Sequence, residues 1–542
     1  MTERQPIFIL PENFNRMMGK DAQRNNIMAA RMVADTVKTT LGPKGMDKML
    51  VNGMGDIIIT NDGVTILEEM QIEHPAAKML VEVAKTQEDL VGDGTTTAVI
   101  IAGKLLENAE KLLDQKIHPT VIARGYRIAA EFSQNILQEI ATNIGKDDKL
   151  LLKNIAVTAM TGKGAETEKE ILSEIIIKAV TQVMEQKDGK NSIDMNNIKL
   201  VKRKGSGIED SELIEGIVLD KEKVHSDMPS AVKGAKIALI DSALEIKGPE
   251  TDTKISISSP EQLQAFLDQE ERTLKNMVEK IKSSKANVVI CQKGIDDIAQ
   301  YYLTREGIYG IRRVSRSDME KLAKATGAKI VSKINELSEK DLGNAKIVEE
   351  IKQGNEEGMT YIRGCVNPKA LTILIRGGTE HVIDEIERAI KDALGDVSAS
   401  LQDGKIVAGG GAVEVELAKR LREKGQSLKG REQLAVQEFA ASLESIPSIL
   451  AENAGLDPID ILTELKARHE KSNEKNFGID VNAGKIDDMM IKGVIEPLRI
   501  KTQAIKSASE VAMMLLRIDD VIASGKGGMQ MPSGPQGQMP EY

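Results

Sequence analysis

A short loop rich in glycine and threonine carries the residue types best suited to holding a phosphate and a metal ion: Val91-Gly92-Asp93-Gly94-Thr95-Thr96-Thr97. Its two glycines allow a tight turn and a close approach of the backbone to a ligand. The threonines open an apolar helix, whose first N–H groups and positive dipole end favour an anion. Asp93 offers a hard oxygen ligand for Mg2+. The chain has no G-x-x-x-x-G-K-[ST] loop, and a glycine turn followed by a threonine N-cap fits the same residues equally well.

Other loops place glycines or charges at the ends of predicted elements. Gly42 follows a predicted helix and is most simply a helix C-cap. The turn 61–63 follows a predicted strand and leaves the Asp62 carboxylate at the strand end. Three glycines, 409–411, open another helix. These loops could all serve one ligand only if distant parts of the chain meet.

Two charged features have an ordinary interpretation on local sequence alone. Lys163 lies between two glycines and could meet a terminal phosphate, but its local pattern favours a solvated loop lysine. The helix predicted over 380–394 carries several acids, most of which are expected to form a solvated face: Asp384, Glu385, Glu387 and Asp392.

Hydrophobic periodicity predicts helical first and last thirds around an α/β middle. The predicted helices cover 27–41, 168–184, 260–281, 380–394 and 412–421, with further helices over most of 75–143. The predicted strands cover 57–60, 236–240, 287–291 and 329–331. A polar run over 245–258 before an amphipathic helix fits an arm that leaves its domain and returns. The tail 525–542 is predicted to be disordered.

Composition limits the class of protein. A chain of 542 residues exceeds one core and predicts several domains. A net charge of -10 argues against nucleic acid as the main partner. The two cysteines, Cys291 and Cys365, lie far apart in strand-like runs and are predicted to be reduced and buried. No signal peptide or membrane-length apolar run is present, so we expect a soluble, cytoplasmic protein without membrane contact.

Four separated motifs in order closely resemble the group II chaperonins of the thermosome type: residues 40–48, 60–65, 91–97 and 407–411. The resemblance covers nearly the whole chain. It implies an ATPase chaperone that encloses non-native polypeptides in a ring chamber and drives the cycle by ATP hydrolysis. The implied ligands are ATP and Mg2+, with K+ left open.

The resemblance also implies a multidomain α and α/β architecture. A mostly helical equatorial domain would comprise 1–144 and 403–542, and a small intermediate domain 145–213 and 369–402. An α/β apical domain would comprise 214–368, with a helical lid protrusion at about 244–271 that replaces a separate cap protein. The subunits would form two stacked rings of eight.

The implied site residues follow the same motifs. Leu41 and Gly42 would lie against the nucleotide, and Gly410 and Glu496 near its base and ribose. Asp93 would hold Mg2+, and Gly94, Thr95, Thr96 and Thr97 would surround the phosphates. Asp62 and Asp392 would orient and activate the attacking water, and Lys163 would sense the terminal phosphate. Asp396 departs from the family pattern, which predicts an apolar residue there.

Clients would bind apolar apical surface, for which Tyr301, Tyr302 and Leu303 are candidates that could equally belong to the core. Two functions other than that of a chaperone could also use a nucleotide site. A small-molecule kinase or ligase would need a second-substrate site, and the sequence offers none that is convincing. A ring-forming scaffold with vestigial nucleotide binding would not need the intact set Asp62, Asp93 and Asp392.

Overall fold

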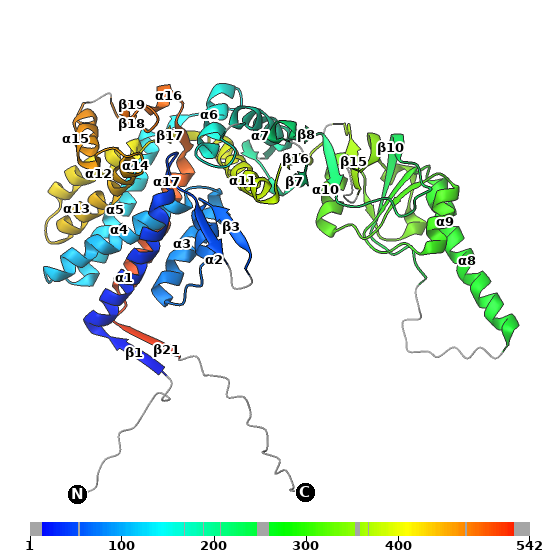
Figure 1. Ribbon diagram of the computed structural model, residues 1–542, viewed down its shortest axis with the longest axis horizontal. Coiled ribbons are helices and arrows are strands. Elements are labelled where there is room, and N and C mark those ends of the chain that lie inside the picture. The colour runs from blue at the N-terminus through cyan, green and yellow to red at the C-terminus, as the bar shows by residue number, and fades with distance from the viewer. Residues whose placement is uncertain are drawn as a thin grey trace, which may run out of the picture.

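The structure, a computed structural model, describes residues 14–51, 55–166, 168–187, 189–205, 207–246, 259–352, 358–366, 368–471 and 474–524. The elements form three bodies that follow one another in an arch (Figure 1). The chain passes through the first two bodies twice. This arrangement confirms the predicted multidomain α and α/β fold. The predicted disordered tail and residues 247–258 of the predicted lid lie outside the described residues.

The first body combines the two ends of the chain around one aliphatic core. Its N-terminal elements are β1 (Phe14–Met18), α1 (Gly19–Val37), β2 (Lys48–Val51), β3 (Ile57–Thr60), α2 (Gly63–Glu69), α3 (Pro75–Val91), α4 (Thr95–Asp114), α5 (Pro119–Ile140) and β4 (Thr142–Asn143). Its C-terminal elements are β17 (Lys405–Ala408), α12 (Ala412–Ser427), α13 (Glu432–Leu443), α14 (Ser445–Asn453), α15 (Pro458–His469), β18 (Phe477–Asp480), β19 (Lys485–Asp488), α16 (Met489–Lys492), β20 (Ile495–Pro497), α17 (Leu498–Leu516) and β21 (Asp520–Ser524).

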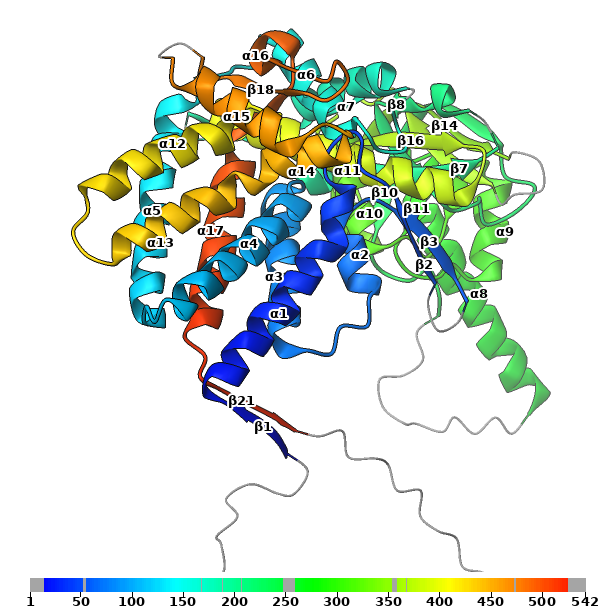
Figure 2. The ribbon, with the colours of Figure 1, turned by 60° about the vertical axis from the view of Figure 1, so that its left-hand side comes forward.

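Helix α4 lies at the centre of the first body. Its apolar run 98–102 is fully buried, and the helix packs against α1, α3, α13 and α17. Figure 2 shows α1, α4 and α17 side by side, with β1 and β21 paired below them in antiparallel register. Burial of this run removes a large apolar area from water, which is the main force that holds the two chain ends together.

The second body joins the first to the third. It contains α6 (Lys149–Met160), α7 (Lys169–Val183), β5 (Glu185–Lys187), β6 (Lys190–Ser192), β7 (Ile198–Lys204), β8 (Glu212–Ile214), β16 (Leu371–Gly377) and α11 (Glu380–Asp403). Helix α11 runs nine residues beyond its predicted end at Leu394, because the face carrying Val397 and Leu401 is still buried. Gly395 allows α11 to pass close to the end of α3, since a Cβ at position 395 would lie 2.7 Å from the Val91 carbonyl oxygen.

The third body is a sheet covered on both faces. Its elements are β9 (Gly216–Leu219), β10 (Ala231–Ile240), α8 (Pro260–Ser283), β11 (Val288–Cys291), α9 (Asp297–Arg305), β12 (Tyr309–Ile311), α10 (Arg316–Thr326), β13 (Ile330–Val331), β14 (Gly343–Ile351) and β15 (Met359–Arg363). The strand order is β12-β11-β10-β14-β15-β9, and β13 pairs with β10. Strands β10, β11 and β12 are parallel, as predicted, and successive residues of β10 and β11 alternate between two buried clusters.

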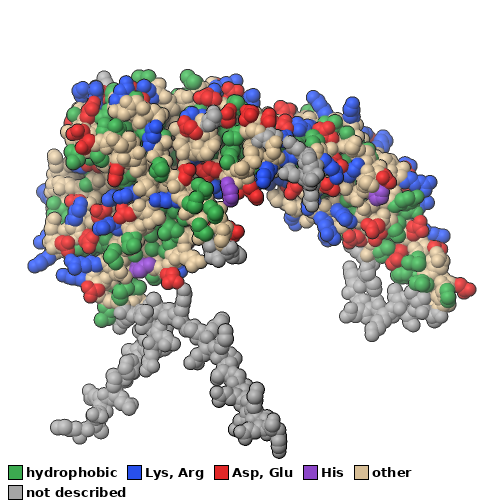
Figure 3. All heavy atoms as spheres, in the orientation of Figure 1, with side chains coloured by type: hydrophobic (Ala, Val, Ile, Leu, Met, Phe, Trp, Pro, Cys, Tyr) green, Lys and Arg blue, Asp and Glu red, His purple; other side chains and the backbone are tan. Residues whose placement is uncertain are grey.

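Helix α8 starts as the sequence predicts, because the Ser259 side chain accepts a hydrogen bond from the backbone N–H of Gln262. In its second half Leu274, Val278 and Ile281 are buried in the third body, whereas Leu263, Phe266 and Leu267 in its first half are exposed. Apolar side chains gather over this end of the molecule in Figure 3.

Several predicted boundaries are wrong. Helix α1 begins at Gly19 and ends at Val37, and α12 continues to Ser427. The last third of the chain, predicted to be helical, also contains short strands. Residues 477–480 pair with β19, and residues 495–497 pair with β17. Both cysteines are free and buried, as predicted. Among the described residues, we find no helix that combines the length and apolar character of a membrane span.

Candidate functional site

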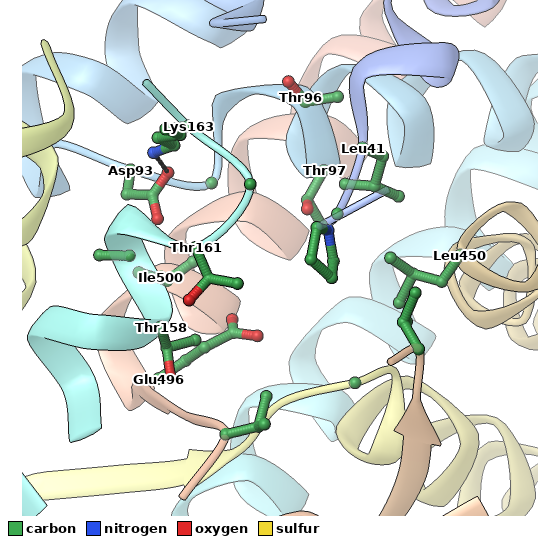
Figure 4. Close-up of a pocket in the computed structure, with 18 of the residues that line it drawn as sticks. Leu41, Asp93, Thr96, Thr97, Thr158, Thr161, Lys163, Leu450, Glu496 and Ile500 are labelled. Carbon is green, nitrogen blue, oxygen red and sulfur yellow. Dashed lines mark ion pairs between the residues drawn. The ribbon is translucent and has the colours of Figure 1, made fainter. Parts of the chain in front are cut away.

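A pocket of about 460 Å³ lies where the first two bodies meet. All but one of the predicted site residues line it: Leu41, Gly42, Asp62, Asp93, Gly94, Thr95, Thr96, Thr97, Lys163, Gly410 and Glu496. The other one, Asp392, is buried on α11 and lines an adjoining cavity together with Asp62. Figure 4 shows Lys163 and Asp93 on one side of the pocket and Leu41 and Leu450 on the other. The fold thus brings together loops that are hundreds of residues apart in sequence.

The glycine–threonine loop leads into α4 without a side-chain cap. Gly94 is the N-cap residue with a φ of 80°, and Thr95 is already helical, so the predicted threonine N-cap is wrong. A Cβ at Gly94 would lie 2.5 Å from Cγ2 of Ile500, which leaves no room for a larger residue. Gln87 Nε2 donates to the Asp93 carbonyl at 2.8 Å and fixes the loop. The first N–H groups of a 20-residue helix are therefore available to an anion at the pocket.

The Asp62 carboxylate is held in one orientation by the start of α2. Its Oδ2 accepts from the Thr65 backbone N–H at 2.8 Å and from Thr65 Oγ1 at 2.6 Å. The neighbouring Asn61 Nδ2 donates to the Gly162 carbonyl at 2.8 Å and joins the first body to the second. The predicted turn is thus also a helix cap, and this fixes where the carboxylate points.

Lys163 is not a solvated loop lysine. Its Nζ contacts the Asp392 carboxylate and lies 3.6 Å from Asp93 Oδ1. Burial opposes the charge on Lys163, but the Asp392 and Asp93 carboxylates outweigh burial and raise its pKa above the ordinary value. The solvated interpretation is wrong because the fold covers this loop with partners that lie 70 and 229 residues away in sequence.

Asp392 does not belong to a solvated face either, because only 6% of it is exposed. Burial is the main cause that raises its pKa, to about 7; Asp93 and Asp62 add to this effect and Lys163 opposes it. A carboxylate with a pKa near neutrality is well matched to the role of a general base.

The adjoining cavity, of about 270 Å³, contains an acid that sequence reasoning missed. Glu88 of α3 lines it together with Asp62 and Asp392. Burial, followed by the charges of Asp392, Asp62 and Asp93, raises the pKa of Glu88 to about 8. Its position five residues before Asp93 was the only local signal available.

Asp396 occupies a wall of the main pocket and is only 2% exposed. Its Oδ1 has no hydrogen-bond partner within the described part of the chain. Burial, with the nearby Asp93 carboxylate as the next cause, raises the pKa of Asp396 well above its ordinary value. The family pattern predicts an apolar residue here, and the structure shows why: the position is buried one helical turn after Asp392.

The other end of the pocket contains a buried ion cluster that the sequence did not reveal. Lys501 Nζ lies 2.9 Å from Glu414 Oε1 and 2.7 Å from Glu496 Oε2. Burial opposes the charge on Lys501, yet Glu414 and Glu496 raise its pKa. Gly410 accepts a hydrogen bond from the Ile479 backbone N–H at 2.9 Å, so β18 forms part of the wall. Apolar side chains complete this end: Leu41, Ile446, Leu450, Ile479 and Ile500.

The chain matches known proteins over nearly its whole length. The TCP-1/cpn60 chaperonin family model matches residues 33–526. A thermosome subunit of Methanopyrus kandleri is 62% identical over 518 residues, which cover 96% of this chain and 95% of that protein. The thermosome subunit beta of Archaeoglobus fulgidus is 59% identical over 537 residues, or 99% and 98% of the two chains. A solved open-state monomer of a group II chaperonin from Methanococcoides burtonii is 48% identical with a TM-score of 0.59, covering 79% of this chain and all of that one.

The chain belongs to the TCP-1/cpn60 chaperonin family, and its similarities place it among the group II chaperonins. Its function is accordingly that of an ATP-dependent chaperone, in which ATP hydrolysis drives a protein-folding cycle. The kinase, ligase and vestigial-scaffold alternatives are set aside on this ground.

Proposed function

We propose that ATP binds in the main pocket with its triphosphate at the start of α4 and its nucleoside at the end formed by Gly410 and Glu496. The support is geometric, because uncapped N–H groups of α4 and the Lys163 cation converge on one end, and apolar walls and glycine backbone form the other. The single observation that carries this proposal is the position of Lys163 between Asp93 and Asp392.

Asp93 is the residue that would hold Mg2+. Mg2+ is usually bound by one or two carboxylates together with substrate phosphates, and Asp93 at the start of an anion-binding helix fits this donor set. When bound, the ion neutralises charge on the phosphates. We leave the use of K+ open.

Asp62 and Asp392 line one cavity from opposite bodies and act on the attacking water. The water oxygen bonds to the γ-phosphorus while the bond from that phosphorus to the bridging oxygen of ADP breaks. Asp392 accepts the proton that the water loses, and Asp62, held by Thr65, orients the water. Lys163 stabilises charge on the phosphoryl oxygens as they develop it.

Nucleotide state is coupled to shape because these groups belong to two bodies. Asp62 and Asp93 belong to the first body, whereas Lys163 and Asp392 belong to the second. A γ-phosphate competes with Asp93 and Asp392 for Lys163, so ATP and ADP interact differently with the hinge. Only such differential contacts can shift a conformational equilibrium.

The three bodies correspond to the proposed equatorial (1–144, 403–542), intermediate (145–213, 369–402) and apical (214–368) domains. We further propose two stacked eight-membered rings in the cytoplasm, closed by a lid at about 244–271 without a cap protein. The exposed apolar residues at the start of α8 support the lid. Of the candidate client residues, Leu303 is buried, whereas Tyr301 is exposed. Leu303 is therefore not available to bind clients.

The variant Asp392→Ala tests the site. It should lower ATP turnover by about 10²- to 10⁴-fold, the usual contribution of a general base, and leave ATP affinity within a few fold. Asp384→Ala on the same helix, which loses an ion pair with Lys202, is the control and should retain turnover. Turnover near wild type in Asp392→Ala would refute the role of Asp392 as the proton acceptor. Negative-stain images of the same samples test whether the subunits form the proposed rings.

A further inference from the structure

A buried histidine behind the nucleoside end of the pocket joins the two elements that form that end. His469, the last residue of α15, has a side chain that is 0% exposed. Its Nδ1 lies 3.0 Å from Oε2 of Glu416 on α12, and its Nε2 lies 2.8 Å from the carbonyl oxygen of Phe477 on β18. His469 therefore connects α12 with β18.

Both partners of this imidazole are hydrogen-bond acceptors. A carbonyl oxygen can only accept. Burial raises the pKa of Glu416, but the hydrogen bonds from His469 and Arg420 outweigh burial and lower it, so Glu416 is an ionised acceptor. A neutral imidazole has one N–H and one lone pair, and it would leave one of these contacts without a proton. With a proton on each ring nitrogen, His469 can donate to both acceptors.

Strand β18 reaches the pocket two residues after this contact. The Ile479 N–H donates to the carbonyl oxygen of Gly410, just before α12, and Ile479 and Asp480 line the pocket. The strand is therefore attached to the α12 segment at two points, directly through Gly410 and indirectly through His469 and Glu416. The attachment through His469 and Glu416 holds β18 at its position in the pocket wall.

On the basis of the proposed nucleotide position, we propose that His469 is a positioning residue for the nucleotide, and that only its doubly protonated form holds β18 in place. Loss of one ring proton makes a nitrogen lone pair face an acceptor oxygen, which replaces a hydrogen bond by repulsion in a buried setting. The strand then loosens, and nucleotide affinity falls.

Other charged side chains also lie around His469. It lines a cavity of about 520 Å³ between α12, α14 and α15, together with Lys419, Arg422, Glu423, Glu444, Lys466 and Glu470. These are three cations and three anions, and Glu444 is paired with both Arg422 and Lys466. Beside β18, Arg468 and Glu474 pair with each other at 3.6 Å. Glu416 is the ionised group that the imidazole contacts.

The variant Glu416→Gln separates the two protonation states. Its amide oxygen can accept from Arg420 Nε, which now donates to Glu416 Oε1 at 2.7 Å, and its NH2 group can donate to Nδ1 of a neutral His469. The Nε2–H of His469 then still donates to Phe477. This variant therefore keeps β18 attached with a single ring proton. Arg420→Gln is the matched control, because it removes the other partner of Glu416 and leaves the histidine contact.

The measurement is the dissociation constant of ADP with Mg2+ on the assembled protein, from about pH 6 to about pH 10, a range that brackets imidazole titration. In wild type and Arg420→Gln the constant should rise toward alkaline pH, by up to about tenfold per unit for one linked proton. Asp392 and Glu88, whose pKa values are raised to about 7 and about 8, add their own rise in every variant, so Glu416→Gln should show a smaller rise than Arg420→Gln. His469→Leu should bind ADP more weakly than wild type at acidic pH and should show the same smaller rise.

A wild-type curve without the alkaline rise, or a Glu416→Gln curve that follows wild type, would overturn the inference. If His469→Leu does not fold, the comparison of wild type with Glu416→Gln still decides. Failure of wild type to bind ADP at every pH would instead overturn the proposed function.

Discussion

The proposed phosphate end of the pocket takes its charged groups from two bodies, whereas the buried ion cluster at the proposed nucleoside end lies in the first body alone. Lys163 approaches Asp93 from the second body and pairs with it across the boundary, and it also contacts Asp392 within the second body. Lys501, Glu414 and Glu496 lie on α17, α12 and β20 and form a closed buried cluster within the first body.

This difference suggests that the one-body cluster holds the nucleotide and that the two-body cluster responds to it. A cluster whose ion pairs lie within one body can keep them when the hinge moves. A cluster divided between two bodies can exchange partners, because a phosphate can replace a carboxylate at Lys163. We therefore expect damage at the nucleoside end to reduce stability, and damage at the phosphate end to reduce turnover.

The largest expected effect follows removal of the nucleoside-end cation. Lys501→Met leaves Glu414 and Glu496 buried without their common partner, which should lower the free energy of unfolding by about 3 to 5 kcal/mol. Urea unfolding of the variant measures this loss. The double variant with Glu414→Gln removes one of the two stranded charges and should recover part of it. A single variant as stable as wild type would break the comparison.

The equivalent change at the phosphate end should act on rate. Lys163→Met removes the cation that faces the transferred phosphoryl group, so turnover should fall about 100-fold. Its effect on unfolding should stay below about 1 kcal/mol, because the raised pKa of Asp392 lets that carboxyl take up a proton instead of remaining a buried charge. Lys153→Met, which breaks a surface ion pair with Glu170 on the same body, is the control and should leave turnover unchanged.

Turnover should also depend on pH through Asp392, whose pKa is raised to about 7. Below that value the residue is protonated and cannot accept a proton, so turnover should fall about tenfold per pH unit as the solution is acidified. The rising limb should move to higher pH in Lys163→Met, because Lys163 lowers the pKa of Asp392. Steady-state ATP hydrolysis between pH 5 and 9 checks both statements, and an unshifted limb would assign it to another group.

The sequence predicts the features of this pocket that depend on neighbouring residues. The glycine loop, the strand–turn at Asp62 and the helix start at Ser259 follow from local turn and cap chemistry, and all are present. The burial of Lys163 and the Lys501 cluster depend on contacts that span as many as 229 and 87 residues, respectively, which no local pattern contains. The resemblance to chaperonins named Lys163, Asp392 and Glu496, but it could not indicate Glu88, Glu414 or His469.

The smallest expected effect concerns Asp396, where the chain departs from the family pattern. Asp396 is buried and its Oδ1 has no partner in the described structure, so its pKa is raised and its ionised form opposes folding. A raised pKa means that its contribution is favourable only below the ordinary value of an aspartate and is lost as pH rises. Asp396→Val should therefore raise the free energy of unfolding by about 1 kcal/mol, and by more at pH 8 than at pH 5. Asp396→Asn keeps the size and polarity and should gain less. Loss of stability in Asp396→Val would show that the carboxyl group makes a stabilising contact in the folded protein, and would place it with the proposed phosphate end as a working part of the site.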